Sequence, residues 1–415
     1  MTGWRRSGRR AACCLTAVVL GVQALTGCDV SGGGDRGDHG RAAAERLLKR
    51  WSAAVRDRDE SAYLAAVDPA AEGYRAERRR VFASLASVPL ASWEYRLVRT
   101  GGFAPAAGDG RRLAAQVELR YRLAGYDSAP VSTALRLTLV RRDGGWYVAG
   151  QDAGGGGAQL WEQGEVTVVR GRRGIVLGVG QDPQRLRAVA DLVDRAVPDV
   201  DGAWRGPWAE RVVVEMPASL DRMAALLGAP AANYRGIAAV TTGEVGGGPA
   251  APADRIIVNP EAYGALGDFG RRIVLTHETA HVATRARTSA ATPLWLSEGF
   301  ADWAAYRATG RTARQAAPEL AAALEAGSAP RELPEDADFG FTGEAGRLAR
   351  AYEGGWLACR MIAERWGEER LVAFYAAVGA RKKRAGAVDG ALREVLGVSA
   401  GEFTQQWRRY VTDAF

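Results

Sequence analysis

The stretch that decides the interpretation of this sequence reads RRIVLTHETAHVAT and spans residues 271–284. Its apolar residues have helical spacing and it contains no proline, so it is predicted to form a helix. Two of the chain's three histidines, His277 and His281, stand here in the pattern H-E-x-x-H. Residues four apart on a helix share one face at about 6 Å, so both imidazoles can reach one ion. Neutral imidazole nitrogens suit zinc.

A catalytic zinc site needs a third protein ligand and leaves its fourth position to water. Glu278 follows His277 and points about 100° further round the helix, toward the open position of the predicted ion rather than the ion itself. The third ligand must therefore come from elsewhere. The candidate stretch for it lies downstream and reads WLSEGFAD, residues 295–302.

These two stretches together resemble the gluzincin metallopeptidases, which include thermolysin-like and aminopeptidase-N-like enzymes. In that family a glutamate on a second helix follows H-E-x-x-H. In the aminopeptidase-like members this helix has the sequence pattern W-L-x-E-G-x-A, which residues 295–301 match at every fixed position. The resemblance implies that Glu298 is the third zinc ligand. Sixteen residues separate His281 from Glu298, slightly fewer than is usual in the family, and a shorter connection between the helices would account for this.

Two further positions fit the same resemblance. Asp302 stands one helical turn after Glu298, where thermolysin-like enzymes carry a carboxylate that holds the ring N–H of the first histidine. The stretch AYEGGW of residues 351–356 matches the Y-E-x-G pattern of aminopeptidase-like members. In those enzymes the tyrosine hydroxyl stabilises the oxyanion, so the resemblance implies this role for Tyr352.

The implied activity is hydrolysis of peptide bonds in a peptide or protein substrate, with one Zn²⁺ ion and Glu278 as general base. The G-x-M-E-N segment with which aminopeptidase-like members grip a substrate N-terminus is missing from the sequence. We therefore favour an endopeptidase, or a peptidase of undetermined exo- or endo-type, over an aminopeptidase. A strand at 236–240 or at 256–259 could form a sheet edge that binds an extended peptide by backbone pairing.

Two other classes of function stay open at this point. One is a surface-tethered binding module whose zinc site is structural or vestigial, although such a site would need neither Glu278 nor Tyr352. The other is a hydrolase of glycans or wall polymers. Glycosidases use paired carboxylates without a metal, so activity that resists a chelator would favour that class.

The beginning of the chain has the pattern of an export signal. Residues 1–10 are basic, and residues 11–26 are an uncharged run too short for a membrane span of about 20 apolar residues. The run leads into Leu-Thr-Gly-Cys, which resembles the lipobox of bacterial lipoproteins. The resemblance implies a signal peptide over 1–27, lipidation of Cys28, and an extracytoplasmic protein anchored to the cell membrane. Residues 28–40 are predicted to be a flexible, glycine-rich tether.

Composition excludes several other classes of protein. The 415 residues are 47% hydrophobic and 25% charged, which is typical of soluble globular chains and unlike disordered or polytopic membrane proteins. Residues 1–27 contain four arginines and no acid, which leaves +3 of the net charge of +7 for residues 28–415. This balance argues against a nucleic-acid partner. Cys359 is the only thiol expected in the mature chain, so no internal disulfide is predicted.

Residues 41–152 are predicted to form a first domain, with helices followed by an antiparallel sheet. Helical spacing comes first, and apolar and polar residues then alternate over 113–121 and 131–139. Asp143 and the glycine after it are a hairpin signal. Helices followed by a curved sheet resemble the cone-shaped SnoaL-like fold. The domain contains no histidine or paired acids suited to chemistry, so a packing or spacer role is expected.

Residues 160–415 are predicted to form the gluzincin domain, separated from the first by the glycine run 154–157. Strand and helix patterns alternate in its first hundred residues, and from residue 268 onward the pattern is helical. The chain is therefore predicted to be α+β, with a mixed sheet followed by a mostly helical C-terminal part.

Overall fold

The computed structural model describes residues 36–152, 158–243, 251–340 and 345–415. The predicted signal peptide, Cys28 and the glycine run between the domains lie outside these residues. Within the described ranges, no helix is both long enough and apolar enough to cross a membrane.

The tether prediction was wrong for its last five residues. Helix α1 (Arg36–Arg56) already includes residues 36–40. Two of these five residues are glycines, each of which costs a helix about 1 kcal/mol relative to alanine. The segment contains no proline, so the strongly amphipathic pattern that follows can extend the helix backward across them.

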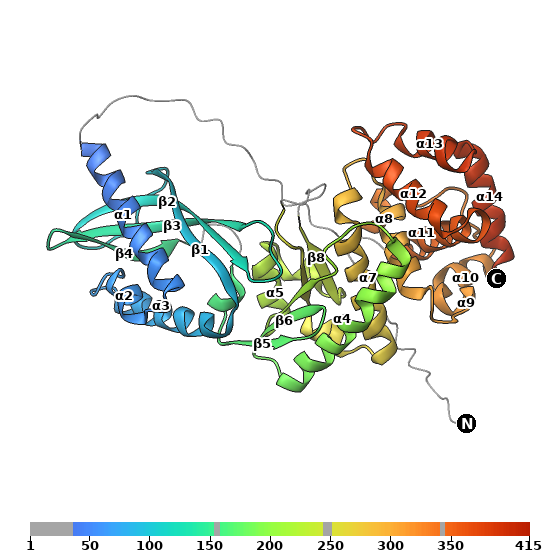
Figure 1. Ribbon diagram of the computed structural model, residues 1–415. Helices are drawn as coiled ribbons and strands as arrows, with labels where there is room; N and C mark the ends of the chain where they lie inside the picture. Colours follow the sequence, from blue (N-terminus) through green and yellow to red (C-terminus); the bar gives the residue numbers. More distant parts are fainter. Residues whose placement is uncertain (1–35, 153–157, 244–250, 341–344) are drawn as a thin grey trace, which may run out of the picture.

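The N-terminal domain packs three helices against a four-stranded antiparallel sheet (Figure 1). Its sheet follows sequence order, and the predicted Asp143-Gly144 turn joins the last two strands with positive φ at both residues. The helices precede the sheet in the chain, and kinship with the SnoaL-like fold stays a prediction. The elements are α1, α2 (Glu60–Ala65), α3 (Glu72–Ser84), β1 (Leu90–Thr100), β2 (Arg111–Leu123), β3 (Val131–Arg142) and β4 (Gly145–Asp152).

The second domain begins with a five-stranded sheet, which lies centrally in Figure 1. Its three inner strands run parallel, and the two outer strands are antiparallel to their neighbours. Helices α4 (Pro183–Trp204) and α7 (Asp268–Thr284) share a hydrophobic core with it, and α5 (Leu220–Leu227) follows its third strand in the chain. In spatial order the strands are β5 (Val166–Arg170), β6 (Gly174–Val179), β7 (Val212–Met216), β9 (Arg255–Val258) and β8 (Ala239–Thr242).

The position of β8 decides between the two predicted edge strands. β8 is one of the two edge strands of this sheet and pairs only with β9 among the described strands. β9 is hydrogen-bonded to β7 on one side and to β8 on the other, and all four of its residues are buried. The prediction that 256–259 could be an edge was therefore wrong, because this apolar stretch is an interior strand.

The two domains share one hydrophobic core. Trp161, in the segment that connects them, packs edge-on against Tyr121 of β2 with ring centroids 4.8 Å apart. The same cluster continues into Ile175 and Leu177 of β6 and Val213 of β7. The N-terminal domain is therefore packed directly onto the second sheet.

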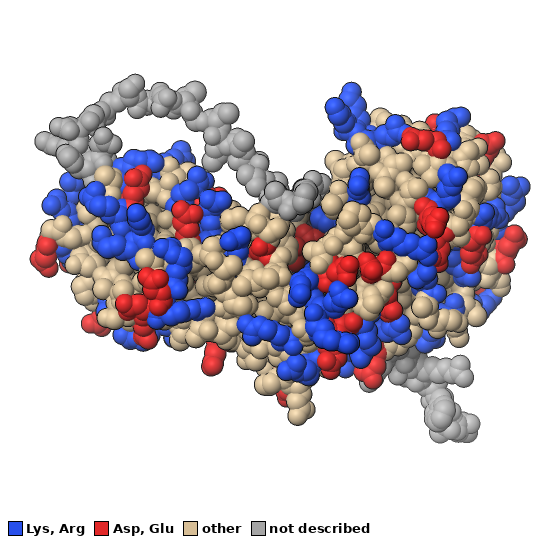
Figure 2. Space-filling view, in the orientation of Figure 1, with Lys and Arg blue, Asp and Glu red and all other residues tan. Residues whose placement is uncertain are grey.

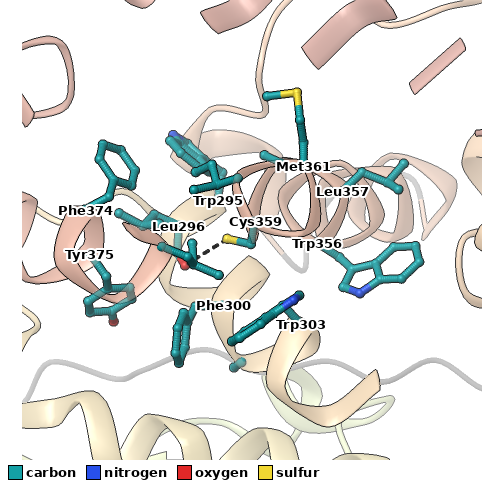
Figure 3. Packing of buried hydrophobic residues seen from close by; sticks show 14 of the residues in the cluster. Trp295, Leu296, Phe300, Trp303, Trp356, Leu357, Cys359, Met361, Phe374 and Tyr375 are labelled. Carbon is teal, nitrogen blue, oxygen red and sulfur yellow. Dashed lines mark hydrogen bonds between the residues drawn. The ribbon is translucent and has the colours of Figure 1, made fainter. Parts of the chain in front are cut away.

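The C-terminal part is helical, as predicted from residue 268 onward. Its core surrounds Cys359, which is fully buried among aromatic and aliphatic side chains such as Trp295 and Phe300 (Figure 3). The expectation that this thiol packs as a small hydrophobic group is confirmed. After α7 the helices are α8 (Leu294–Tyr306), α9 (Ala313–Ala316), α10 (Pro318–Glu325), α11 (Ala345–Trp366), α12 (Glu368–Gly379), α13 (Ala387–Ala391) and α14 (Ala400–Asp413), and α6 (Pro260–Gly264) precedes α7.

Charges of both signs are mixed over the visible surface. Figure 2 shows Asp and Glu side chains interspersed with Lys and Arg on both domains. The prediction that the chain has no nucleic-acid partner stays a prediction.

Helices α8 and α11 approach each other closely enough to require glycine. A Cβ on Gly355 would lie 2.6 Å from the carbonyl oxygen of Trp295, and a Cβ on Gly299 would overlap the carbonyl group of Gly355. Neither distance is compatible with a side chain. Gly299 directly follows Glu298, and Gly355 lies three residues after Tyr352, so this crossing sets the position of both candidate site residues.

Substituting Gly299→Ala is predicted to lower the free energy of unfolding by about 3 kcal/mol, because the two helices must separate to admit the methyl group. Urea unfolding measures this change. Gly401→Ala is the matched control: a Cβ there meets no atom within 4 Å, and alanine in a helix should stabilise the chain by up to about 1 kcal/mol. A Gly299→Ala variant as stable as the wild type would refute the close crossing.

Candidate metal centre

Helices α7 and α8 bring three predicted ligands together. The Nε2 atoms of His277 and His281 are 3.0 Å apart. Glu298 Oε2 lies 3.2 Å from the first of these nitrogens and 3.3 Å from the second. All three side chains are more than nine-tenths buried. The sixteen-residue spacing between His281 and Glu298 is thus long enough for the second helix to reach the first.

This triangle has the dimensions of a zinc site. Ligands about 2.0–2.1 Å from a tetrahedral zinc ion stand about 3.3 Å from one another. Two imidazoles and one carboxylate are also the donor set of a catalytic zinc site that keeps one position open. The other oxygen, Glu298 Oε1, is buried without a hydrogen-bond partner among the described residues, which is costly unless a cation offsets it. The residues therefore fit one zinc ion.

The site's charges also suit a cation. Burial by itself would raise the pKa of Glu298, but the two neighbouring imidazoles outweigh it and lower the pKa to about 2. Glu298 is therefore ionised across the physiological range. Burial lowers the pKa of His281, which favours the neutral imidazole that a metal requires.

Asp302 is hydrogen-bonded to the first histidine. The Nδ1–H of His277 donates a hydrogen bond to Asp302 Oδ1 at 2.6 Å. With the proton held on Nδ1, the lone pair of Nε2 is directed at the other two ligand atoms. The structure thus places Asp302 where the sequence resemblance did. Its carboxylate also raises the pKa of His277 against the opposing effect of burial.

Glu278 is fully buried and held by a residue that the sequence analysis did not identify. The hydroxyl of Thr241, on edge strand β8, lies 2.6 Å from Glu278 Oε2 and donates to it. Glu278 Oε1 has no partner among the described residues. Burial raises the pKa of Glu278 to about 8. No motif marks Thr241, because it reaches Glu278 only through the packing of the sheet against α7.

Tyr352 lies beside the first histidine. Its ring centroid is 6.4 Å from that of His277, and the residue is 5% exposed. Phe339 packs edge-on against the tyrosine ring at 5.1 Å. The structure therefore brings the predicted tyrosine to the same place as the three candidate ligands, although the roles of all these residues stay predictions.

The neighbouring Glu353 has a structural task. Its two carboxylate oxygens accept hydrogen bonds from the backbone N–H groups of Glu319 and Leu320, at 3.1 and 2.6 Å. These are orphan donors in the first turn of α10, so Glu353 caps that helix from α11. Burial nevertheless raises the pKa of Glu353 from 4.5 to about 7.

Comparisons with known proteins give structural neighbours only. No family model and no curated protein matches the chain. One neighbour is a two-domain M1 zinc metallopeptidase variant bound to L-arginine, with 17% identity, a TM-score of 0.31, and coverage of 66% of this chain and 58% of that one. Another is an M1 zinc metallopeptidase variant from Deinococcus radiodurans bound to a Tyr-Ser-Ala substrate. Its sequence identity is 16% and its TM-score is 0.32, and the match covers 67% of this chain and 59% of that one. The chain spans less than two thirds of the length of these neighbours.

The zinc content of the protein should depend on each of the three candidate ligands. The zinc-loaded wild type is predicted to hold one ion per chain, whereas His281→Ala and Glu298→Ala lose it on dialysis because two ligands bind too weakly. Asp302→Asn should weaken zinc affinity about 10–100-fold, since it no longer fixes the imidazole. Metal analysis and competition with a chromophoric chelator measure both effects. Full zinc occupancy in Glu298→Ala would disprove the assignment of this ligand.

Folding stability should depend on pH through Glu353. The folded-state pKa is about 7 and the unfolded value is 4.5, so the folded state binds the extra proton between them. Protonated Glu353 therefore contributes most to the free energy of unfolding below pH 4.5. This contribution, up to about 3 kcal/mol, is lost as the pH rises through 7. Urea unfolding at pH 5 and pH 8 should show a smaller difference for Glu353→Gln than for the wild type. An equal change in stability between pH 5 and pH 8 in the two proteins would show that Glu353 does not cause the pH dependence.

Proposed function

We propose that this chain is a zinc-dependent metallopeptidase. The observation that carries the proposal is the buried triangle of His277, His281 and Glu298, whose edges measure 3.0–3.3 Å. A candidate base, Glu278, stands on the same helix as two of these ligands. The low-identity likeness to M1 zinc metallopeptidases agrees with this proposal but does not carry it.

A bound zinc ion would polarise the scissile carbonyl and make water nucleophilic near neutral pH. The chain supplies the proton transfers. Thr241 holds Glu278 Oε2, whereas Oε1 has no partner among the described residues and would take the proton of the attacking water and pass it to the leaving amine. Burial raises the pKa of this carboxylate, which increases its affinity for the proton that it takes as a base. The Tyr352 hydroxyl would donate to the developing oxyanion.

The substrate class follows from the edge strand. β8 carries Thr241, which contacts the proposed base, and β8 lies at the outer side of its sheet. An extended peptide could add to this edge by backbone hydrogen bonds and so pass beside Glu278. This mode binds the middle of a chain as well as its end, which supports the preference for an endopeptidase.

Location is proposed from the sequence alone. The basic start, the short apolar run and the Leu-Thr-Gly-Cys sequence support export and lipidation at Cys28. The proposed enzyme would then act outside the cytoplasm, anchored to the cell membrane by lipid. A shift from membrane to soluble fractions in Cys28→Ala would support this proposal.

Replacing the base should separate catalysis from metal binding. Glu278→Gln keeps the size of the side chain and an oxygen for Thr241, but it cannot take a proton. Hydrolysis of a quenched fluorescent peptide library is predicted to fall at least 10²-fold while zinc content stays at one ion per chain. Hydrolysis that persists in this variant would disprove the base assignment.

The wild-type protein distinguishes the alternative classes in the same assay. A zinc-loaded chain that cleaves no peptide would favour the binding module with a structural site. Hydrolysis of a glycan in the presence of chelator would favour a glycosidase.

A further inference from the structure

A turn of the N-terminal domain contacts the second domain through a buried ion pair. Asp127 lies between β2 and β3, and its side chain is fully buried. Its two oxygens accept hydrogen bonds from the guanidinium of Arg255, the first residue of β9, at 2.7 and 2.8 Å. They also accept from the backbone N–H groups of Leu123 and Ala253, at 2.6 and 3.0 Å. Three of these four hydrogen bonds therefore join the N-terminal domain to the second domain.

The residue before Arg255 is held from the helix side. Asp254 Oδ2 accepts a hydrogen bond from the Nε–H of Arg285 at 2.7 Å, and both side chains are at least nine-tenths buried. Arg285 directly follows α7, one turn beyond His281. Gly243, which ends the described part of the β8 segment, leaves room for Asp254, because a Cβ there would overlap its carboxylate. The beginning of β9 is therefore held by one buried ion pair to the N-terminal domain and by another to the residue that follows α7.

The strand register passes this constraint to the candidate base. Arg255 pairs with Thr242 across the β8–β9 ladder, and Ile256 pairs with Thr241. Successive residues of a strand point to opposite faces of the sheet, and paired residues share a face. Arg255 reaches the N-terminal domain, so Thr241 is turned toward α7, where it donates to Glu278 Oε2. A one-residue slip of the ladder would remove this hydroxyl from the carboxylate.

We propose that Asp127 is a positioning residue of the proposed peptidase, through which the N-terminal domain holds β9 and β8 in the register that keeps Thr241 on Glu278. This inference rests on the proposed function and deepens it. It gives the N-terminal domain a role in the active site in place of the packing or spacer role expected from the sequence.

Asp127→Asn breaks the ion pair without changing the size of the side chain. Asp68→Asn is the matched control, because Asp68 is equally buried and binds Arg142 through Nε and Nη2, at 2.9 and 3.2 Å, entirely within the N-terminal domain. Each variant loses the ion pair of a buried carboxylate, and each is expected to be less stable than the wild type. Only Asp127→Asn should alter the second sheet.

Hydrogen exchange of the zinc-loaded proteins tests, without any assay of activity, whether Asp127 holds β8 and β9 in place. In Asp127→Asn, amides of β8 and β9 should exchange about tenfold faster than in the wild type. In Asp68→Asn they should exchange at the wild-type rate. If Asp127→Asn fails to fold, the double variant Asp127→Asn/Arg255→Gln, which removes both charges, is measured instead. Unchanged exchange in β8 and β9 would overturn the proposal.

Steady-state kinetics then tests positioning, at a temperature where every variant has wild-type circular dichroism and full zinc. We expect kcat to fall about tenfold in Asp127→Asn and in Thr241→Val, with KM unchanged, while Asp68→Asn keeps both constants. The Asp127→Asn/Thr241→Val double variant should be no slower than the slower single variant, because both act through one hydrogen bond.

Additive losses, or a wild-type kcat in Asp127→Asn, would overturn the positioning role. A wild type that cleaves no peptide would instead disprove the proposed function. The exchange experiment would still decide whether Asp127 holds β8 and β9 in place.

Discussion

Burying a carboxylate is unfavourable unless positive charge or hydrogen bonds replace the water that it loses. Glu298 is 1% exposed, and one of its oxygens has no hydrogen-bond partner among the described residues. Its other oxygen lies against two imidazole nitrogens. This arrangement is favourable with a divalent cation among the three groups, and the surrounding structure preserves it. Asp302 fixes one ring, and the glycine contact between α8 and α11 fixes the helix that carries the carboxylate.

A second set of contacts, on the sheet side of α7, positions the candidate base Glu278. Thr241 lies on an edge strand, and its hydroxyl holds one oxygen of Glu278. Such a strand is paired on one side only, so its position depends on what fixes its partner β9. The Asp127–Arg255 and Asp254–Arg285 pairs supply that support from two directions. The metal ligands and the base are thus held by different parts of the fold.

Much of the site could be predicted because its information is local. The positions of His277 and His281 follow from helical spacing, and Glu298, Asp302 and Tyr352 occur in short stretches that resemble a known family. Thr241 could not be found in this way, because its contact with Glu278 depends on the register of a two-stranded ladder. The Asp127–Arg255 pair spans 128 residues of sequence and has no local signal. The edge strand was ambiguous for the same reason, since strand order is a property of the whole sheet.

X-ray absorption spectroscopy of the zinc-loaded protein tests the central claim most directly. If His277, His281 and Glu298 hold the ion, its nearest neighbours are nitrogen and oxygen atoms at about 2.0–2.1 Å, with the multiple-scattering pattern of two imidazoles and no sulfur. A sulfur neighbour near 2.3 Å, or a shell without imidazole, would contradict this assignment.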